Sequence, residues 1–286
     1  MNKRWDGNRI KDNLFRWFGI LCTLFGLLML SVFLISVIKE GAPRLSAQFF
    51  TSLPSRKPES AGILIPLLGT IWIMVLTSLI AIPLGVASGI YLEEYGKKSR
   101  IASIIEINIT NLAGVPSIIY GLLALEVFVR ILGLGKSLLA GSLTLALLIL
   151  PIIIVATREA LKAVPKTIRE ASYALGATKW QTTWHQVLPA SSGGIVTGVI
   201  LAISRAIGET APLIVIGAML YITTVPSSPM DDFSVLPIQI FNWFSRPQKG
   251  FIINATAAII ILLAITFMLN GIAIYLRNRW QKKVKW

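Results

Sequence analysis

Cysteine and histidine are almost absent from this chain of 286 residues, which contains one of each. Cys22 has no partner within the chain, so no intramolecular disulfide bond stabilises it. His185 stands without metal-ligand spacing around it, and the sequence lacks a nucleophile motif or a pair of carboxylates suited to acid–base chemistry. The sequence therefore predicts neither a metal site nor an enzyme.

Charged residues are also scarce. They make up 14% of the chain, whereas hydrophobic residues make up 55%, a composition far from that of an ordinary soluble domain. A bilayer crossing needs about 20 residues of helix. Six apolar runs reach that length, over 15–38, 63–92, 101–128, 138–157, 194–220 and 251–276. We expect an all-α, polytopic integral membrane protein with six transmembrane helices.

These runs define the expected organisation of the chain. A segment over 1–14 precedes a transmembrane domain over 15–276, which contains a long loop over 158–192, and a basic tail follows over 277–286. The first apolar run exceeds the roughly 7–15 residues of a signal-peptide core and no A-x-A cleavage site follows it. We therefore expect it to be a retained membrane anchor.

Acidic residues are few, and the 27 Lys and Arg against 13 Asp and Glu give a net charge of +14. The two ends and the loops after spans two and four hold 18 of the basic residues, and the alternate loops hold 8. The positive-inside rule then places both termini in the cytoplasm. Short basic segments beside membrane spans interact with anionic lipid headgroups, so we do not expect nucleic-acid binding.

The loop over 158–192 has the pattern of two short helices. Pro165 suits a first helical turn, Gly176 suits a helix C-terminus, and Thr178 with Gln181 has the spacing of a capping box. The second helix is predicted to present one apolar face, formed by Trp180, Trp184 and Val187, and to end before Pro189. A structured, amphipathic loop of this kind is a candidate docking element.

The fifth apolar run carries two charges, Arg205 and Glu209. Charged residues at membrane depth face a bundle interior, pair with one another or mark a transport path. The i, i+4 spacing predicts that both lie on one face of a continuous helix, with Arg205 near mid-bilayer. Arg205 is a candidate for transient contact with an anion, because its guanidinium presents a planar fork of donors. An ion pair that only fixes helix packing is the alternative.

Two further features of the sequence are a candidate bend at Pro116 and a segment that resembles a P-loop. Pro116, with Gly114 before it, is a candidate for a bend near a transport path. The segment over 133–137 ends like a nucleotide-binding P-loop, but Arg130 occupies the position of the required first glycine. We therefore do not expect this chain to bind ATP through that motif.

The cytoplasmic loop carries a resemblance to a known family. Glu170-Ala171-Ser172, with Gly176 four residues after Ser172 and Leu188-Pro189 further on, resembles the EAA loop of permease subunits of bacterial ABC importers. The strings over 111–122 and 205–213 resemble the phosphate-specific ABC importer permeases of the PstA type. The resemblance covers nearly the whole chain. It implies the type I ABC importer permease fold and a location in the bacterial plasma membrane.

The resemblance also implies roles and partners. It assigns Arg205 and Glu209 to phosphate translocation, and it assigns six loop residues to coupling with the ATPase: Glu170, Ala171, Ser172, Gly176, Leu188 and Pro189. The implied partners are a second homologous permease of the PstC type, two ATPase subunits, an extracytoplasmic phosphate-binding protein and membrane lipids. This chain itself is expected to bind no cofactor, because ATP and Mg²⁺ would be bound by the ATPase subunits.

Two rival functions stay open. A permease for another oxyanion or nutrient would keep the cytoplasmic loop and change the intramembrane residues. A secondary transporter or channel would need no ATPase and commonly contains inverted repeats, of which the sequence gives no clear sign. A membrane enzyme ranks below both, since residues for chemistry are missing.

Overall fold

The computed structural model describes residues 3–96, 100–218 and 221–281. The end of the fifth predicted span at Leu220 and the last five residues of the basic tail lie outside this range. Within it, the regular elements are helices, accompanied by one isolated bridge between Ser137 and Asp232. The expectation of an all-α fold is confirmed.

Among the described residues, five α-helices are long and seven are short. The long helices are α1 (Lys3–Gly41), α3 (Leu64–Ile90), α6 (Leu138–Lys162), α9 (Leu188–Ile207) and α12 (Lys249–Gln281). The short helices are α2 (Ala47–Thr51), α4 (Arg100–Ala113), α5 (Ser117–Ala124), α7 (Lys166–Ala174), α8 (Lys179–Thr182), α10 (Ala211–Ile216) and α11 (Leu236–Phe244). Three π-helical turns, Tyr91–Tyr95, Leu125–Ile131 and Thr183–Val187, continue α3, α5 and α8.

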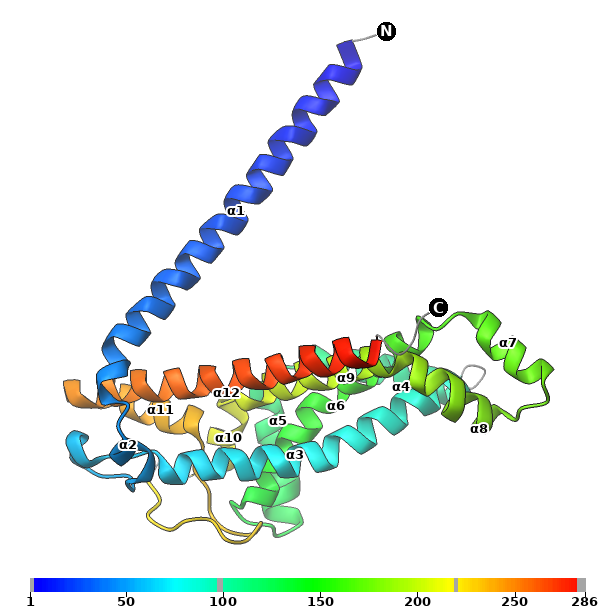
Figure 1. Cartoon of the computed structure of the whole chain (residues 1–286). Coiled ribbons are helices and arrows are strands. Elements are labelled where there is room, and N and C mark those ends of the chain that lie inside the picture. Colours follow the sequence, from blue (N-terminus) through cyan, green and yellow to red (C-terminus); the bar gives the residue numbers. More distant parts are fainter. Residues whose placement is uncertain (1–2, 97–99, 219–220, 282–286) are drawn as a thin grey trace.

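Helices α3, α6, α9 and α12 form a bundle, with α7 and α8 projecting from one end (Figure 1). We call this the hairpin end and the other, near α2 and α11, the opposite end. Small residues let the helices approach closely. A Cβ atom on Gly85 would lie 2.6 Å from Cγ2 of Ile153, and one on Gly198 would lie 2.2 Å from Cβ of Ala156. Gly194 and Gly198 form a G-x-x-x-G on α9, and a Cβ atom on Gly194 would lie 2.7 Å from Cβ of Ala160. This motif thus packs against α6.

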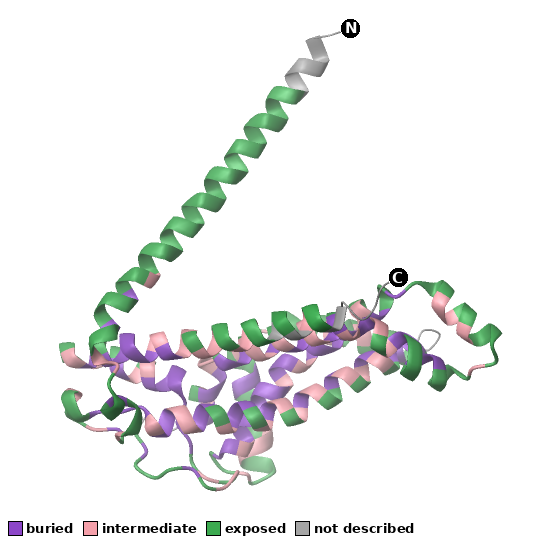
Figure 2. Cartoon of the chain, in the orientation of Figure 1, coloured by how far each residue is buried: buried purple, intermediate pink, exposed green. Residues whose placement is uncertain are grey.

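Helix α1 leaves this bundle at an angle and is exposed along almost its whole described length (Figures 1 and 2). It contacts α12 near its C-terminal end, where Val37 and Gly41 are buried. A Cβ atom on Gly41 would lie 2.7 Å from the backbone nitrogen of Ala257. The side chains of α1 beyond this junction are mostly large and apolar, as expected of a surface that faces lipid or another chain.

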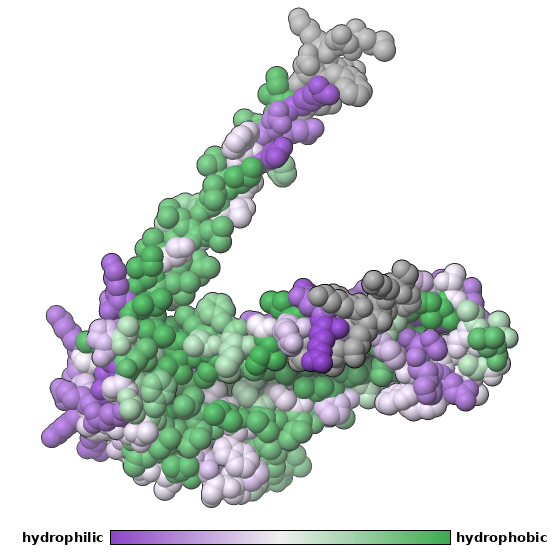
Figure 3. All heavy atoms as spheres, viewed as in Figure 1, coloured by the Kyte–Doolittle hydropathy of each residue, from purple (hydrophilic) through white to green (hydrophobic). Residues whose placement is uncertain are grey.

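The surface has the polarity of a membrane protein. On the face shown, hydrophobic side chains form a band over the bundle and hydrophilic side chains gather at its two ends (Figure 3). Among the described residues, five helical segments are long and apolar enough to cross a membrane, and a sixth is formed if the bent pair α4–α5 counts as one span.

The third predicted span, 101–128, is not a straight helix. It consists of α4 and α5, which meet at an angle of 109°. Pro116 immediately precedes α5; a proline disfavours helical geometry in the residue before it and cannot donate a backbone hydrogen bond. The bend therefore lies at the point that the sequence indicates.

The fifth predicted span, 194–220, differs more from expectation. Helix α9 ends at Ile207, Gly208 to Thr210 are not helical, and α10 ends before Gly217, whose φ is +91°. Pro212 explains the break, because its ring would clash with the carbonyl of Gly208 and it lacks the N–H that would bond there. The continuous helix expected around Arg205 and Glu209 is therefore wrong.

The boundaries of the predicted loop 158–192 also differ. Helix α6 continues past residue 157 to Lys162, so Arg158 is helical. The second helix of the loop does not end before Pro189, since α8, the π-helical turn and α9 form one helical segment over Lys179–Ile207. Pro189 lies in the first turn of α9, directly after a turn in which Leu188 bonds to Thr183 five residues back. This π geometry accommodates the missing proline donor.

A loop over 226–232 covers the start of α6. The N–H groups of Leu138 and Leu139 donate to the carbonyl oxygens of Asp231 and Pro229 at 3.0 and 2.8 Å, which satisfies donors that a helix N-terminus leaves unpaired. The Asp231 carboxylate accepts from the N–H groups of Ser227 and Ser228 at 2.7 and 2.9 Å. These hydrogen bonds hold the pKa of Asp231 below its ordinary value.

Candidate functional site

Arg205 and Glu209 lie at the break between α9 and α10. Arg205 is in the last turn of α9, and Glu209 follows in the non-helical residues. The N–H of Glu209 donates to the carbonyl of Ala206 at 3.2 Å, so the chain turns tightly and keeps both side chains together. Nε of Arg205 lies 3.4 Å from Oε1 of Glu209. The pair forms, although its two members do not share one continuous helix.

The two members of this pair differ in exposure. The Arg205 side chain is 51% exposed and that of Glu209 is 16% exposed. Within the described residues, Nε makes the one hydrogen bond of the Arg205 side chain, and that bond is long. The terminal nitrogens of the guanidinium therefore point a fork of donors at the surrounding space. Such a fork suits two oxygens of a tetrahedral anion.

The bend between α4 and α5 holds Gly114 and Pro116. The N–H of Gly114 donates to the carbonyl of Asn111 at 3.0 Å, and Pro116 caps α5. Across the bend, the Tyr120 hydroxyl donates to the carbonyl of Leu112 at 2.8 Å, which pairs a carbonyl that the broken helix leaves without its usual partner.

The two broken segments meet each other. Helix α5 packs on α10, and a Cβ atom on Gly121 would lie 2.7 Å from Cα of Pro212. Glycine is therefore required for the backbones to approach so closely. Interrupted helices that meet inside a membrane bundle are a recurring setting for substrate sites in transporters. The charged pair and the bend expected from the sequence thus belong to one region.

Four of the six residues assigned to the coupling loop lie on α7 and the turn that joins it to α8. Glu170 and Ala171 are exposed on α7, and the Ser172 hydroxyl is hydrogen-bonded to that of Thr182 at 2.9 Å, which ties α7 to α8. Gly176 has a φ of +83° at the turn, as its predicted role at a helix C-terminus requires. The hairpin is thus held in shape by its own side chains.

Leu188 and Pro189 are further along, at the start of α9, where Leu188 is partly buried and Pro189 is exposed. The capping box of Thr178 and Gln181 is present. The predicted apolar face is only partly buried: Val187 is buried, whereas the stacked rings of Trp180 and Trp184 are exposed, with centroids 5.4 Å apart. The exposed aromatic rings make this part of the hairpin a candidate protein-binding surface.

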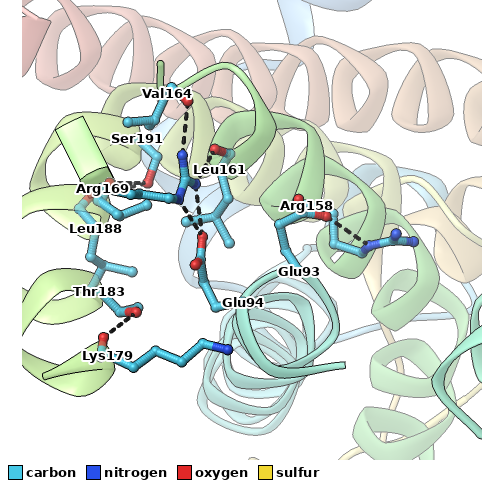
Figure 4. A network of polar contacts seen from close by, with 11 residues as sticks. Glu93, Glu94, Arg158, Leu161, Val164, Arg169, Lys179, Thr183, Leu188 and Ser191 are labelled. Atoms are coloured by element: carbon cyan, nitrogen blue, oxygen red, sulfur yellow. Dashed lines mark hydrogen bonds and ion pairs between the residues drawn. The ribbon is translucent and has the colours of Figure 1, made fainter. Parts of the chain in front are cut away.

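Sequence reasoning missed a polar network behind the hairpin. Figure 4 shows Arg169 of α7 directed at Glu94, and Arg158 of α6 beside Glu93. All four side chains are at least 87% buried, with exposures of 13% and 5% in the first pair and 12% and 2% in the second. The available signal was the Glu93-Glu94 doublet at the end of an apolar run, but its partners are 65 or more residues away in the sequence.

Within the described residues, no group of three or more His, Cys, Asp and Glu side chains could hold a metal ion. The P-loop-like segment has a local structural role: Gly133 and Gly135 adopt positive φ angles, and the Ser137 hydroxyl accepts a hydrogen bond from the N–H of Ala140 as the cap of α6.

Comparison with known proteins adds three findings. Residues 81–282 match the family model of binding-protein-dependent transport system inner membrane components. The phosphate transport system permease protein PstA 1 of Mycobacterium tuberculosis H37Rv is 33% identical over 277 residues, which covers 94% of this chain and 88% of that protein. The PstA protein of Haemophilus influenzae is 37% identical over 74% of this chain and 75% of its own length.

Solved structures agree on the fold. A bacterial ABC transporter involved in the import of the acidic polysaccharide alginate superposes with a TM-score of 0.68 at 14% identity, over 97% of this chain and 99% of that one. The MetNI methionine ABC transporter, in an inward-facing conformation, gives a TM-score of 0.62 at 17% identity, over 74% of this chain and 94% of that one.

Proposed function

Because the chain belongs to the family of binding-protein-dependent transport system inner membrane components, we propose that it is the permease subunit of an ATP-driven importer of inorganic phosphate. The assignment of phosphate as the substrate rests on the similarity to proteins named as phosphate transport permeases, at 33% and 37% identity over most of the chain. The exposed guanidinium of Arg205 at the break of α9 is chemically consistent with this substrate.

Arg205 provides a passing contact for the anion. A phosphate oxygen pair can accept from the terminal guanidinium nitrogens while Nε stays with Glu209. Glu209 has two uses in this scheme: its carboxylate holds the arginine when no anion is present, and it accepts from a protonated phosphate hydroxyl. Its negative charge also keeps the arginine from binding the anion too tightly, which transport requires because the substrate must leave again.

The hairpin supplies the contact with the ATPase. Glu170, Ala171 and Ser172 lie on the projecting helix α7, and Gly176 forms its turn. The exposed rings of Trp180 and Trp184 are suited to a protein groove. In this scheme ATP and Mg²⁺ are bound and hydrolysed by two partner ATPase subunits, and Leu188 and Pro189 carry the motion of the hairpin directly into α9.

The orientation of the chain is inferred from its charge distribution, and its remaining partners are inferred from its family. The hairpin end carries the basic loops, so it faces the cytoplasm together with both termini. A second permease of the PstC type completes the enclosure of the path. A phosphate-binding protein delivers its ligand at the opposite end.

The decisive experiment uses the full complex in proteoliposomes and measures ATP-dependent uptake of phosphate and of sulfate. We expect selective phosphate uptake and, in Arg205→Gln, a loss of about tenfold or more, the order expected when one charge-assisted contact is removed. Arg205→Lys is the matched control, since it keeps the charge and loses the planar fork; intermediate activity is expected.

Other outcomes would contradict parts of the proposal. Uptake unchanged in an assembled Arg205→Gln complex would make the pair a packing feature only. Uptake of a different oxyanion in place of phosphate would show that the protein is an importer subunit whose substrate is not phosphate. Phosphate uptake without ATP would instead favour a secondary transporter.

A further inference from the structure

Arg169 and Glu94 form the centre of a buried charge network behind the hairpin. We propose that this network fastens the hairpin to the ends of α3, α4 and α6, so that Arg169 and Glu94 are positioning residues that make these helices move with the hairpin when the ATPase moves it. The inference rests on the proposed role of the hairpin as the ATPase contact.

Arg169 makes four hydrogen bonds across three elements. Its Nη2 and Nε donate to Oε1 of Glu94 at 2.7 and 3.2 Å, where Glu94 lies in the π-helical turn that ends α3. Nη2 also donates to the carbonyl of Leu161 at 2.9 Å, and Nη1 donates to that of Val164 at 2.9 Å. Leu161 lies in the last turn of α6 and Val164 follows two residues after its end, where a cation is also favoured by the helix dipole. One side chain on α7 thus joins α3 and α6.

The position of Arg169 links this joint to the exposed surface. Arg169 directly precedes Glu170 on a helix of nine residues, so a displacement of α7 moves both. Its side chain is 13% exposed, against 5% for Glu94. Removing either partner would leave a buried charge without its counterion, which is far more costly than losing a surface pair.

A second contact joins the other arm of the hairpin to the same turn. Nζ of Lys179, the first residue of α8, lies 4.8 Å from the centre of the Tyr95 ring. Tyr95 and Glu94 are neighbours at the end of the π-helical turn Tyr91–Tyr95. Both helices of the hairpin therefore contact this one turn. The hairpin is attached through two of its own residues, Arg169 on α7 and Lys179 on α8.

Arg158 extends the network to α4. Its Nη1 lies 2.7 Å from Oε1 of Glu106 on α4, and its Nε lies 3.8 Å from Oε2 of Glu93. Glu93 and Glu94 are adjacent, so the two arginines are connected through one turn of backbone (Figure 4). The network thereby reaches α4, whose far end is the bend at Pro116, and α5 beyond the bend packs on α10.

This arrangement predicts coupled motion. A rigid connection of packed, charge-paired elements runs from the hairpin through α4 and α5 to the break that holds Glu209 and Arg205. Weakening the joint at Arg169 should let the ATPase turn over while the helices follow less completely. The measurable consequence is a change in the ATP hydrolysed per phosphate transported.

The functional test uses Glu94→Gln, which keeps shape and removes charge, and Arg169→Lys, which keeps charge and removes the fork. In the assembled complex we expect either variant to raise the ratio of ATP hydrolysed to phosphate taken up by about tenfold, the order of one lost charge-assisted hydrogen bond. This ratio does not change if a variant merely lowers the amount of folded complex. The double variant should be no worse than the single variants, because both remove the same joint.

Glu159→Gln is the matched control. Glu159 is on α6 near the same end and pairs with Lys162, but its side chain is 64% exposed, so its ratio should change by less than about twofold. An equal rise in Glu159→Gln and Glu94→Gln would overturn the proposal, since the effect would then be one of surface charge. A wild-type ratio in Glu94→Gln would overturn it as well.

A second measurement does not depend on the substrate. Spin labels are placed on α7 and α4 by Tyr173→Cys and Ile104→Cys, both at exposed positions, in a background with Cys22→Ser. In the assembled complex the distance distribution between the labels should be narrow with and without ATP, and Glu94→Gln should broaden it. Equal widths in wild type and Glu94→Gln would refute the joint. Failure of the wild type to take up phosphate would instead refute the proposed substrate and leave this test in force.

Discussion

At the scale of single residues, the contrast between Arg205 and Arg169 explains how one chain uses the same side chain in two ways. Among the described residues, the half-exposed Arg205 side chain makes one long hydrogen bond, to Glu209, whereas the Arg169 side chain is 13% exposed and makes four hydrogen bonds of 2.7–3.2 Å. A weakly held guanidinium can exchange its partner for an anion. A guanidinium held from several sides fixes the elements around it.

Gly198 gives a direct test of close packing between α6 and α9. Gly198→Ala should destabilise the protein by about 1–3 kcal/mol, because the new methyl group would overlap Ala156. Thermal unfolding of the purified protein in one detergent measures the change. Gly19→Ala is the control, since nothing lies within 4 Å of its Cβ position, and it should leave stability equal or slightly raised.

A compensating change makes this prediction sharper. The double variant Gly198→Ala with Ala156→Gly exchanges the two residues and should recover most of the lost stability. If Gly198→Ala melts like the wild type, the two helices are not in the contact described.

Asp231 predicts a pH dependence of the loop 226–232. Hydrogen bonds from Ser227 and Ser228 lower its pKa in the folded state, so the folded state favours the carboxylate more than the unfolded chain does. The stabilisation is complete above the ordinary pKa of about 3.9 and is lost as the pH falls through the lowered value. Hydrogen exchange of this loop, corrected for the intrinsic effect of pH, should therefore show protection that disappears at acidic pH.

Asp231→Asn serves as the comparison for that measurement. An amide has no proton to gain in this range, so the exchange of the loop should become independent of pH there. An acid transition that persists unchanged in Asp231→Asn would assign the effect to another group.

At the scale of elements, the apolar runs were predictable and their interruptions only partly so. Pro116 has Gly114 beside it and the bend appears there. Pro212 has the same chemistry, but the apolar run over 194–220 continues past it, so one continuous helix is predicted there. A proline can kink a helix or end it, and the packing of α10 on α5 through Gly121 decides the outcome here.

The buried network shows a different limit of sequence reasoning. Local patterns found the capping box at Thr178 and the turn at Gly176, because both depend on neighbouring residues. The pairs Arg169–Glu94 and Arg158–Glu106 depend on helices that are distant in the chain. For that reason Arg158, which is the first residue of the predicted loop over 158–192, was not recognised as part of α6.

The hairpin turn supports a prediction at this scale. Gly176 has a φ of +83° and open space around its Cβ position, so the strain of a substitution is in the backbone and not in contacts within the chain. Gly176→Ala should raise the free energy of the hairpin conformation that binds the ATPase by about 1–2 kcal/mol. This increase corresponds to a loss of roughly 5–30-fold in affinity for the ATPase subunits. Binding of purified ATPase to the permease in nanodiscs measures it.

Gly176→Asn separates backbone strain from side-chain bulk. Asparagine tolerates the left-handed conformation, so binding should stay close to the wild-type value. Equal losses in the Asn and Ala variants would show that the partner closes over this position and would contradict the backbone explanation.

At the scale of the whole molecule, two surfaces differ in polarity. The hairpin end holds exposed carboxylate and aromatic groups backed by buried ion pairs, whereas α1 presents an apolar surface with few contacts to its own bundle (Figure 2). The first surface suits a partner that arrives from water, and the second suits lipid or a second membrane subunit.

The junction at Gly41 also has a consequence for the order of biosynthesis. Helix α1 rests on α12, and about 200 residues separate the two helices along the chain. At synthesis rates of roughly 5–20 residues per second, α1 spends on the order of 10–40 s in the membrane before the helix it rests on has been made. During that interval its apolar surface is covered by lipid alone, so its insertion is complete before the rest of the bundle begins to hold it.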